Sequence, residues 1–452
     1  MTKIGLEIHV ALNTKTKLFC KDSTESNSPN TSVCPICLGY PGSKPQLNKK
    51  AIDLAIKAAL MLNCKVRTKF WFDRKIYFYP DLAKNFQITQ HEATIGYDGH
   101  FSIRNKEIRI REIHLEEDPA KIVYTGSIEN SKYVLLDYNR SGVPLIEIVT
   151  EPDFSNSNEV ALFLRKLIRY LEYLDLFNSS REGAIRCDVN VSIEGGERVE
   201  VKNVSGIENI KRAIDYEILR QTTLLNKGEK IKRETRHFDE TLGITIGLRS
   251  KETEEDYGYI YEPDIPIIKI NEEKIEKLKN EVGELPDQRK ERIVLQYKIN
   301  NELATAIVSE RDLADLFEYC CKEINDYQFV AKWIGNYLKK SLNWNNIKFS
   351  QSKVTKEKFL EFLKDIKNKK INEREAKELI KTFVDRGEIA QAESSKEDIQ
   401  KVISEFYDEI SPSINEKGIN HIIGKILKKI NYKADPKELK KLIEKIKEEK
   451  SK

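Results

Sequence analysis

The chain has 452 residues, of which 39% are hydrophobic and 33% are charged, and its formal net charge is +4. This length and composition predict a soluble, globular protein of roughly three domains with a sizeable buried core. No apolar run approaches the roughly 20 residues that span a bilayer, which argues against a membrane protein. The chain has seven cysteines, an odd number that does not suggest a set of paired disulfides. The first strand pattern has no signal peptide before it. Together these features predict a reducing, cytoplasmic location.

The first predicted strand places a carboxylate and an imidazole on the same face. Within residues 4–11, apolar residues alternate with Glu7 and His9. Side chains of a strand alternate with period two, so Glu7 and His9 point together to the face opposite the apolar residues. A carboxylate and an imidazole that converge in this way form half of a divalent-metal or acid–base site. The rest of such a site must come from other segments.

Three cysteines that follow have the spacing of a metal knuckle. Cys34 and Cys37 form a Cys-x-x-Cys pair, and Cys20 precedes them. A closed zinc site needs four ligands, and Asp22 could be the fourth. The pattern leaves two interpretations open: a zinc site formed by these four residues, or three reduced cysteines in a metal-free loop. The remaining cysteines stand in apolar contexts and are expected in the core: Cys64, Cys187, Cys320 and Cys321.

Residues 72–81 combine basic and aromatic side chains. Lys75 follows an arginine and precedes three aromatic residues, Tyr77, Phe78 and Tyr79. Such a segment could bind a phosphate and stack a base, or it could be a core strand that begins with basic residues. Because aromatic residues in strands are more often buried, the residue types alone favour a core strand.

Three consecutive carboxylates, Glu116, Glu117 and Asp118, stand directly before Pro119. Clustering them is costly unless a cation or solvent compensates their charge. Taken alone, this pattern favours an exposed acidic turn over a metal site.

The clearest alternation in the chain predicts a hairpin from residues 185–193 and 198–202. A two-residue Gly-Gly loop would mix the two faces of this hairpin, whereas a three-residue loop at 194–196 keeps apolar residues opposite one another. The three-residue loop predicts three cross-strand pairs: Val191 with Val199, Asn190 with Glu200, and Asp188 with Lys202. Together with Arg186, these polar residues would occupy one face of the sheet.

The distribution of helix signals predicts the domains. Helices are expected at 48–62, at 156–174 and at 205–226, the last with Ser205 and Glu208 as a capping box. Strand patterns alternate with these helices, which predicts an α+β fold for residues 1–290. Short helical patterns without strand signals follow, so an all-α helical domain is expected at 291–391 and a small helical tail domain at 392–452, beginning with a polar linker.

The tail carries the positive charge of the chain. Residues 421–452 contain eleven Lys and five Asp or Glu, so their excess is larger than the net charge of the whole chain. A basic segment on a near-neutral body suggests contact with a polyanion such as RNA. The other interpretation is a solvated, Lys-rich helix face.

Common nucleotide and nucleophile motifs are absent from the sequence. The chain has no G-x-x-x-x-G-K-[ST] loop, no G-x-G-x-x-G turn and no G-x-S-x-G elbow. If the protein uses ATP, a standard glycine loop does not hold it.

Eight segments, in the same order along nearly the whole chain, resemble the B subunit of tRNA-dependent amidotransferases. Members of this family convert Glu-tRNA(Gln) or Asp-tRNA(Asn) to the amidated form. The resemblance implies a cradle-shaped catalytic domain, a helical domain and a tail that contacts tRNA. The segments are residues 4–10, 34–42, 73–81, 114–118, 137–153, 186–190, 234–240 and 261–266.

The resemblance also implies cofactors, partners and residue roles. ATP and Mg²⁺ would be used, with an A subunit that delivers ammonia and a small C subunit completing a heterotrimer that acts on misacylated tRNA. Two alternatives are a noncatalytic tRNA-binding scaffold and a metal-dependent nuclease. The implied roles are magnesium binding for Glu7, His9 and Glu117, phosphoryl transfer for Lys75, Glu117, Asp188 and Glu200, and cofactor contacts for Glu116 and Arg186.

Overall fold

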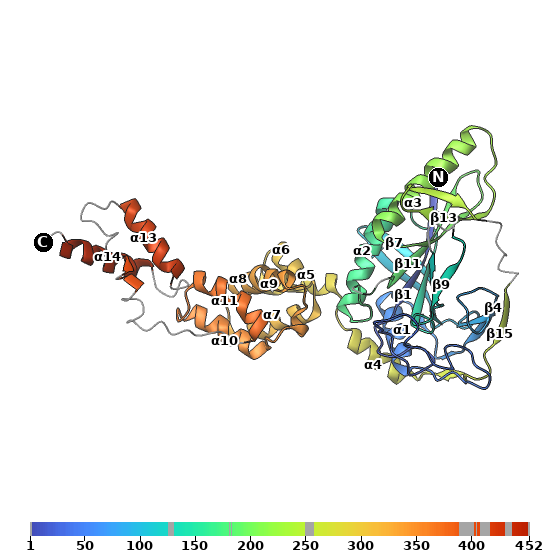
Figure 1. Cartoon of the computed structure of the whole chain (residues 1–452), viewed down its shortest axis with the longest axis horizontal. Helices are drawn as coiled ribbons and strands as arrows, with labels where there is room; N and C mark the ends of the chain where they lie inside the picture. The colour runs from blue at the N-terminus through green and yellow to red at the C-terminus, as the bar shows by residue number, and fades with distance from the viewer. Residues whose placement is uncertain are drawn as a thin grey trace. The chain divides into compact units, whose positions relative to one another are not determined.

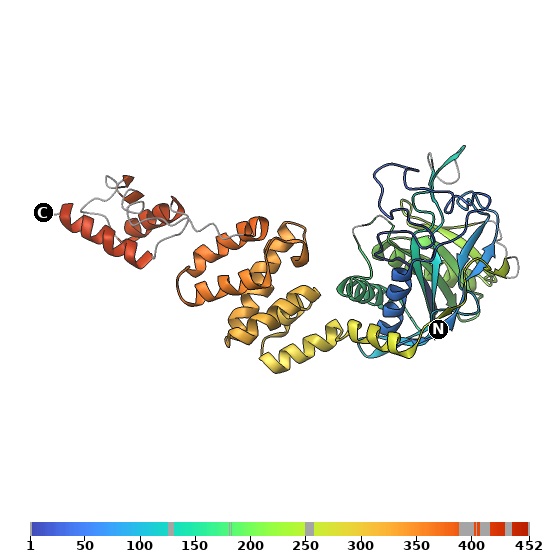
Figure 2. The same cartoon turned by 90° about the horizontal axis from the view of Figure 1, so that it is seen from below.

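The computed structural model divides the chain into two units, residues 1–285 and 286–452. Each unit is shown in Figure 1 and, after a quarter turn, in Figure 2. The described residues are 2–124, 131–179, 181, 183–248, 257–387, 402–403, 405–406, 416–429 and 436–450. Among the helices in these ranges, none has both the length and the apolar character needed to cross a membrane.

A mixed nine-stranded sheet forms the framework of the first unit. Neighbouring strands are antiparallel except for one parallel pair, β12 with β13. In spatial order the strands are β14 (Ile244–Gly247), β13 (Glu234–Asp239), β12 (Val199–Val204), β11 (Ile185–Ile193), β1 (Thr2–Ala11), β10 (Pro144–Thr150), β7 (Lys106–Glu117), β6 (Gly96–Ile103) and β2 (Lys65–Val66).

Three helices bury the apolar face of this sheet. They are α1 (Lys49–Met61), α2 (Ser157–Tyr173) and α3 (Ile207–Asn226), and their apolar stripes join the alternate residues of β1 in one core. Figure 1 shows α2 beside α3. Asn156 caps α2 by accepting a hydrogen bond from the Glu159 amide. The predicted capping box of α3 is wrong, because Gly206 is the N-cap and no side chain caps this helix.

Smaller elements complete the first unit. A three-stranded sheet follows the order β15 (Gly258–Tyr261), β4 (Asp73–Ile76) and β5 (Phe86–Thr89), and β5 lies next to β7. Helix α4 (Glu272–Val282) packs on α1. Two short pairs are β3 (Lys69–Phe70) with β16 (Ile268–Lys269), and β8 (Lys121–Tyr124) with β9 (Val134–Asp137).

The predicted hairpin register is confirmed near the loop and interrupted farther along. Asn190 pairs with Glu200 and Val191 with Val199. A β-bulge between Cys187 and Val189 interrupts the ladder at Asp188, so the predicted pairing of Asp188 with Lys202 does not continue as a regular register, although Lys202 Nζ lies 2.9 Å from Asp188 Oδ2. The extra residue is Asn203, whose φ of 54° is left-handed and whose amide donates to Asp188 Oδ1 at 2.7 Å.

The described residues of the second unit form helices joined by turns, with no strand among them, as Figure 2 shows. Residues 293–384 enclose one core, and a separate core joins the last two helices. The helices are α5 (Pro286–Tyr297), α6 (Asn301–Ile307), α7 (Arg311–Glu323), α8 (Tyr327–Lys332), the π-helix η2 (Trp333–Leu338), α9 (Lys339–Trp344), the 3₁₀ helix η3 (Phe349–Gln351), α10 (Lys356–Lys367), α11 (Glu373–Arg386), α13 (Glu416–Lys429) and α14 (Pro436–Lys450).

The α+β fold class is confirmed by the mixed sheet and the helical second unit. The expected divisions at residues 290 and 391 stay predictions, and the proposed linker at 392–397 lies outside the described residues. The four cysteines expected in the core are buried: Cys64, Cys187, Cys320 and Cys321.

The bulge at Asn203 can be tested by substitution. The side chain is exposed, so its replacement tests the backbone conformation rather than packing. We expect Asn203→Ala to lower the free energy of unfolding by about 1 kcal/mol, because Ala tolerates the left-handed region poorly. Asn203→Gly is the matched control and is expected to be close to neutral. Urea unfolding measures both variants, and equal stability of Asn203→Ala and the parent chain would contradict the prediction.

Candidate active site

Two groups of potential metal ligands lie on the face of the nine-stranded sheet opposite the three helices. Within each group, the ligand atoms lie within 4.8 Å of one another. Five neighbouring strands, from β7 to β12, supply them. The first group is His9, Glu116 and Glu147, and the second is Glu7, Asp188 and Glu200.

Strand register explains why these residues meet. His9 of β1 lies directly opposite Glu147 of β10, and Glu7 lies opposite Asp188 of β11. Directly paired residues of adjacent strands place their side chains on the same face. Since the neighbouring residues of β1 are apolar and buried against the core, the polar residues share the other face.

In the first group, an imidazole lies between a buried carboxylate, Glu116, and a half-buried one, Glu147. His9 Nε2 is 3.6 Å from Glu116 Oε1 and 4.0 Å from Glu147 Oε2. Burial, together with the charge of Glu147, raises the pKa of Glu116. Burial also acts to raise the pKa of Glu147, but His9, His114 and Lys75 lower it below its usual value. Positive side chains therefore favour the ionised form of Glu147, whereas burial favours the neutral form of Glu116.

Lys75 is the lysine whose charge acts on both carboxylates of the first group. It lies on β4, and its Nζ is 4.7 Å from the ring centroid of Tyr257. Burial acts to lower the pKa of Lys75, but Tyr259, Glu116 and Glu147 raise it above its usual value. Lys75 is therefore a charged lysine beside the first group.

In the second group, one lysine joins two carboxylates. Lys202 Nζ is 2.9 Å from Asp188 Oδ2 and 2.8 Å from Glu200 Oε1. Despite burial, Lys202 lowers the pKa of Asp188. Among the described residues no lysine forms an ion pair with Glu7, and burial with the charges of Glu147 and Asp188 raises its pKa to about 7. Asn190 Nδ2 donates to Glu7 at 3.1 Å, while the buried Asn190 Oδ1 has no hydrogen-bond partner in the part of the chain that the structure describes.

The three consecutive carboxylates are not an exposed turn, so that interpretation of the sequence is wrong. Glu116, Glu117 and Asp118 are 5%, 4% and 3% exposed. Strand β7 continues through Glu117, and the neighbouring strand β5 covers it: Thr89 donates to Glu116 at 2.9 Å and the Ile88 amide donates to Glu117 at 2.8 Å.

The three acidic residues have different partners. Glu117 forms an ion pair with Lys84 and belongs to neither group of metal ligands. Asp118 accepts a hydrogen bond from Arg186 Nη2 at 2.8 Å and lies 3.5 Å from Arg140. The structure therefore places Glu116 next to His9. Glu117 instead pairs with Lys84, and Arg186 pairs with Asp118.

Two aromatic residues after β4 are exposed, so the core-strand interpretation is wrong for them. Phe78 is 80% exposed and Tyr79 is 52% exposed. Strand β4 ends at Ile76, and the aromatic residues that follow belong to a loop.

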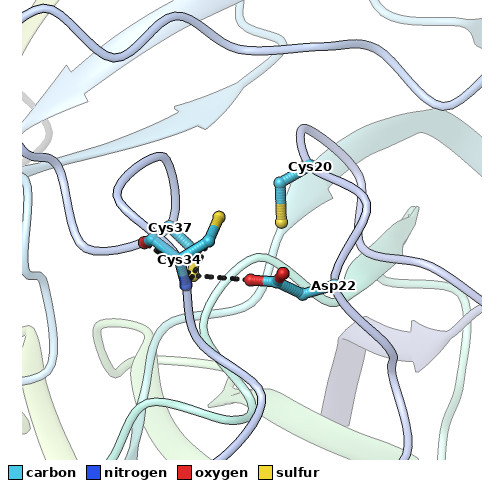
Figure 3. A group of neighbouring side chains, drawn as sticks. All are labelled: Cys20, Asp22, Cys34 and Cys37. Carbon is cyan, nitrogen blue, oxygen red and sulfur yellow. Dashed lines mark hydrogen bonds between the residues drawn. The ribbon is translucent and has the colours of Figure 1, made fainter.

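The cysteine cluster is a second candidate metal centre (Figure 3). Cys37 Sγ is 3.4 Å from Asp22 Oδ2 and 3.9 Å from Cys34 Sγ. With Cys20, the four ligand atoms lie within 4.8 Å of one another. A hydrogen bond with Cys20, followed by the Cys34 amide and Lys17, lowers the pKa of Cys37 to about 6 despite burial. Three sulfurs and one carboxylate oxygen form a suitable tetrahedral donor set for zinc.

Sequence reasoning missed two residues of the sheet face, Glu147 and His114. Burial acts to lower the pKa of His114, but Glu112 and Glu147 raise it to about 9. A signal for Glu147 was present: it is the one charged residue in the apolar strand PLIEIVT. A lone carboxylate in such a strand must face a polar site or remain unpaired at a large cost.

The chain is similar to characterised protein families over nearly its whole length. Residues 2–276 match the family model described as GatB/GatE catalytic domain, and residues 315–446 match the one described as GatB domain.

Three relatives share one description, the B subunit of aspartyl/glutamyl-tRNA(Asn/Gln) amidotransferase. The relative from Saccharolobus solfataricus is 44% identical, over 98% of this chain and 99% of its own length. The relative from Sulfolobus acidocaldarius is 45% identical, with the same coverage of both chains. The relative from Methanospirillum hungatei is 40% identical over 98% of each chain.

The buried pair of Asp118 and Arg186 is expected to stabilise the strand ends beside the site. Replacing one partner of a buried ion pair leaves the other charge uncompensated. We therefore expect Asp118→Asn to lower the free energy of unfolding by roughly 3 kcal/mol. The control is Glu151→Gln, which disrupts the more exposed pair with Arg111 and is expected to cost at most about 1 kcal/mol. Similar midpoints of urea unfolding for the two variants would contradict this difference.

Proposed function

Because the chain belongs to the GatB/GatE family of amidotransferase subunits, we propose that it phosphorylates the side-chain carboxylate of misacylated tRNA with ATP and then amidates it with ammonia. The substrates would be Glu-tRNA(Gln), Asp-tRNA(Asn) or both. The observation that carries this proposal is that the two groups of potential metal ligands lie on one sheet face. Lys75 lies beside the first group, and Lys202 contacts two carboxylates of the second.

The chemistry explains why such a site suits this reaction. A carboxylate is stabilised by resonance and has no leaving group, so ammonia does not displace its oxygen. Transfer of the γ-phosphoryl group to a carboxylate oxygen forms an acyl phosphate. Ammonia then attacks the carbonyl carbon, and inorganic phosphate leaves with the bridging oxygen. Phosphoryl transfer depends on positioning and charge compensation and needs no nucleophile from the protein.

The residues of the two groups fit Mg²⁺. Carboxylate oxygens are its preferred protein ligands, and the unpartnered oxygen of Asn190 beside Glu7 is a further donor. His9, Glu116 and Glu147 would hold one ion, and Glu7, Asp188 and Glu200 would hold another. When bound, such ions would neutralise phosphate oxygens. Lys75 would hold the transferring phosphoryl group by its charge. The roles of Glu117 as a ligand and of Arg186 as a cofactor contact stay predictions.

The cysteine cluster would hold Zn²⁺ in a structural role. Cys20, Asp22, Cys34 and Cys37 supply four donors, and a closed four-ligand site leaves no position for a substrate. This centre would stabilise local structure and would not take part in the reaction.

The relatives are described as one lettered subunit of an amidotransferase, which implies an enzyme of several subunits. We propose an A subunit that releases ammonia from glutamine and a small C subunit, with the basic tail of this chain contacting tRNA. The alternative of a noncatalytic scaffold does not explain why two groups of potential metal ligands gather on one face of the sheet. A metal-dependent nuclease would use the same ligands but would need no ATP. The cytoplasmic location stays a prediction.

Amidation driven by free ammonium tests the activity directly, because it bypasses glutamine hydrolysis. In the assembled enzyme, we expect conversion of misacylated tRNA to require ATP and Mg²⁺. Glu200→Gln removes one charge from the second group and is expected to lower the rate by roughly 100-fold or more. Glu197→Gln is the matched control, because Glu197 is exposed on the same hairpin and should leave the rate unchanged.

The outcomes separate the candidate functions. Conversion that continues without ATP, or equal rates for Glu200→Gln and the control, would contradict the proposed phosphoryl-transfer site. A complex that binds tRNA but amidates neither substrate would favour the scaffold, and Mg²⁺-dependent cleavage of tRNA would favour the nuclease.

The tRNA contact of the tail is tested by salt dependence. Lys441 and Lys445 are exposed one turn apart on α14. If both contact phosphates, replacing both with Gln is expected to flatten the slope of log affinity against log salt by about 0.7 to 0.9 for each lost contact. Glu444→Gln is the control in the same turn and should not weaken binding. An unchanged slope for the double variant would mean that these lysines do not contact RNA.

A further inference from the structure

Lys17 is a lysine with no exposure to solvent. Its relative exposure is 0%, which is unusual for a charged side chain. Its Nζ donates to the carbonyl oxygens of Ser32 at 2.7 Å and Tyr138 at 3.3 Å, and it is 3.6 Å from Cys37 Sγ. Within the described ranges, no carboxylate forms an ion pair with Lys17. The Cys37 sulfur is therefore the group of the cysteine cluster that contacts this buried amino group.

The contact between Lys17 and Cys37 can be explained by the balance of charge in a zinc-loaded centre. A buried ammonium is costly unless a negative group compensates it. Three thiolates and one carboxylate carry four negative charges, and a zinc ion offsets two of them. A loaded centre therefore keeps an excess of negative charge, and Lys17 offsets half of this excess.

We propose that Lys17 is the buried counter-charge of the cysteine centre, and that it is required for tight binding of the metal. This inference rests on the zinc site of the proposed function and adds to it a positioning residue that is not a ligand. Groups just outside a metal's ligands tune its affinity by compensating charge and fixing ligand orientation.

The same lysine joins the centre to the backbone next to the candidate active site. Besides Tyr138, Lys17 contacts the turn at Gly142, where an added Cβ would lie 3.4 Å from Lys17 Cδ and 3.8 Å from Cys37 Cβ. The positive φ of 87° at Gly142 favours glycine, whereas the added Cβ itself would make only ordinary van der Waals contacts. The Gly142 amide donates to the carbonyl oxygen of Asp118 at 2.8 Å. The metal centre thus supports the turn that holds the end of β7.

Substitution of Lys17 in the full chain tests the proposal. Lys17→Met keeps an unbranched, apolar stem and removes the charge. We expect zinc affinity, measured by competition with a chelator, to fall by roughly 10- to 100-fold. Lys15→Met is the matched control, because Lys15 is exposed two residues earlier, and it should bind zinc as tightly as the parent chain. Equal affinity of Lys17→Met and the parent would overturn the proposal.

A second substitution separates charge from packing. Asp22→Asn removes one negative charge from the centre, so the loss of Lys17 should matter less in its presence. We expect Lys17→Met to weaken zinc binding by no more than about threefold in the Asp22→Asn background, since coupled residues give non-additive effects. An equal loss in both backgrounds would assign Lys17 a packing role and overturn the proposal.

Folding and metal content complete the test. If Lys17→Met alone yields no folded protein, recovery of folded protein in the double variant with Asp22→Asn would support the counter-charge, and failure of both would overturn it. A parent chain that binds no zinc, by metal analysis after reconstitution, would overturn the proposed zinc site itself. That result is distinct from a parent that binds zinc equally well with and without Lys17.

Discussion

Compensation of buried negative charge is the constraint on which the first unit depends. Glu116, Glu147 and Asp188 are crowded on one sheet face, where burial and mutual repulsion both disfavour ionisation. Lys75 and Lys202 supply part of the opposing charge. A face of this kind is expensive to maintain for stability alone. Binding of cations and of a transferring phosphoryl group would offset this cost, which supports a catalytic role for this face.

Local sequence pattern predicted the parts of the site that depend on strand alternation. The shared face of Glu7 and His9, and the pairing of Asn190 with Glu200, follow from period two and loop parity. The bulge at Asn203 does not follow, because its hydrogen bond to Asp188 forms only once the two strands are paired. Alternation alone therefore predicts faces better than it predicts register.

Features that depend on distant segments could not be read from local pattern. The carboxylates at 116–118 are buried because β5 covers them, and nothing in their own segment signals that strand. Glu117 rather than Glu116 was expected near His9, whereas the structure pairs Glu117 with Lys84. The cysteine cluster, including Asp22, could be proposed from spacing, but Lys17 could not, since a lysine in a polar loop is normally exposed.

The most direct measurement of the reaction uses Glu-tRNA(Gln) in which both oxygens of the side-chain carboxylate are oxygen-18. The assembled enzyme would amidate this substrate with ATP and ammonium, and the inorganic phosphate would be analysed by mass spectrometry. Activation through an acyl phosphate predicts one oxygen-18 atom in each phosphate released with an amidated product, because the bridging oxygen leaves with phosphorus. Amidation that releases phosphate without oxygen-18 would contradict phosphorylation of the side chain and the role assigned to the carboxylate groups.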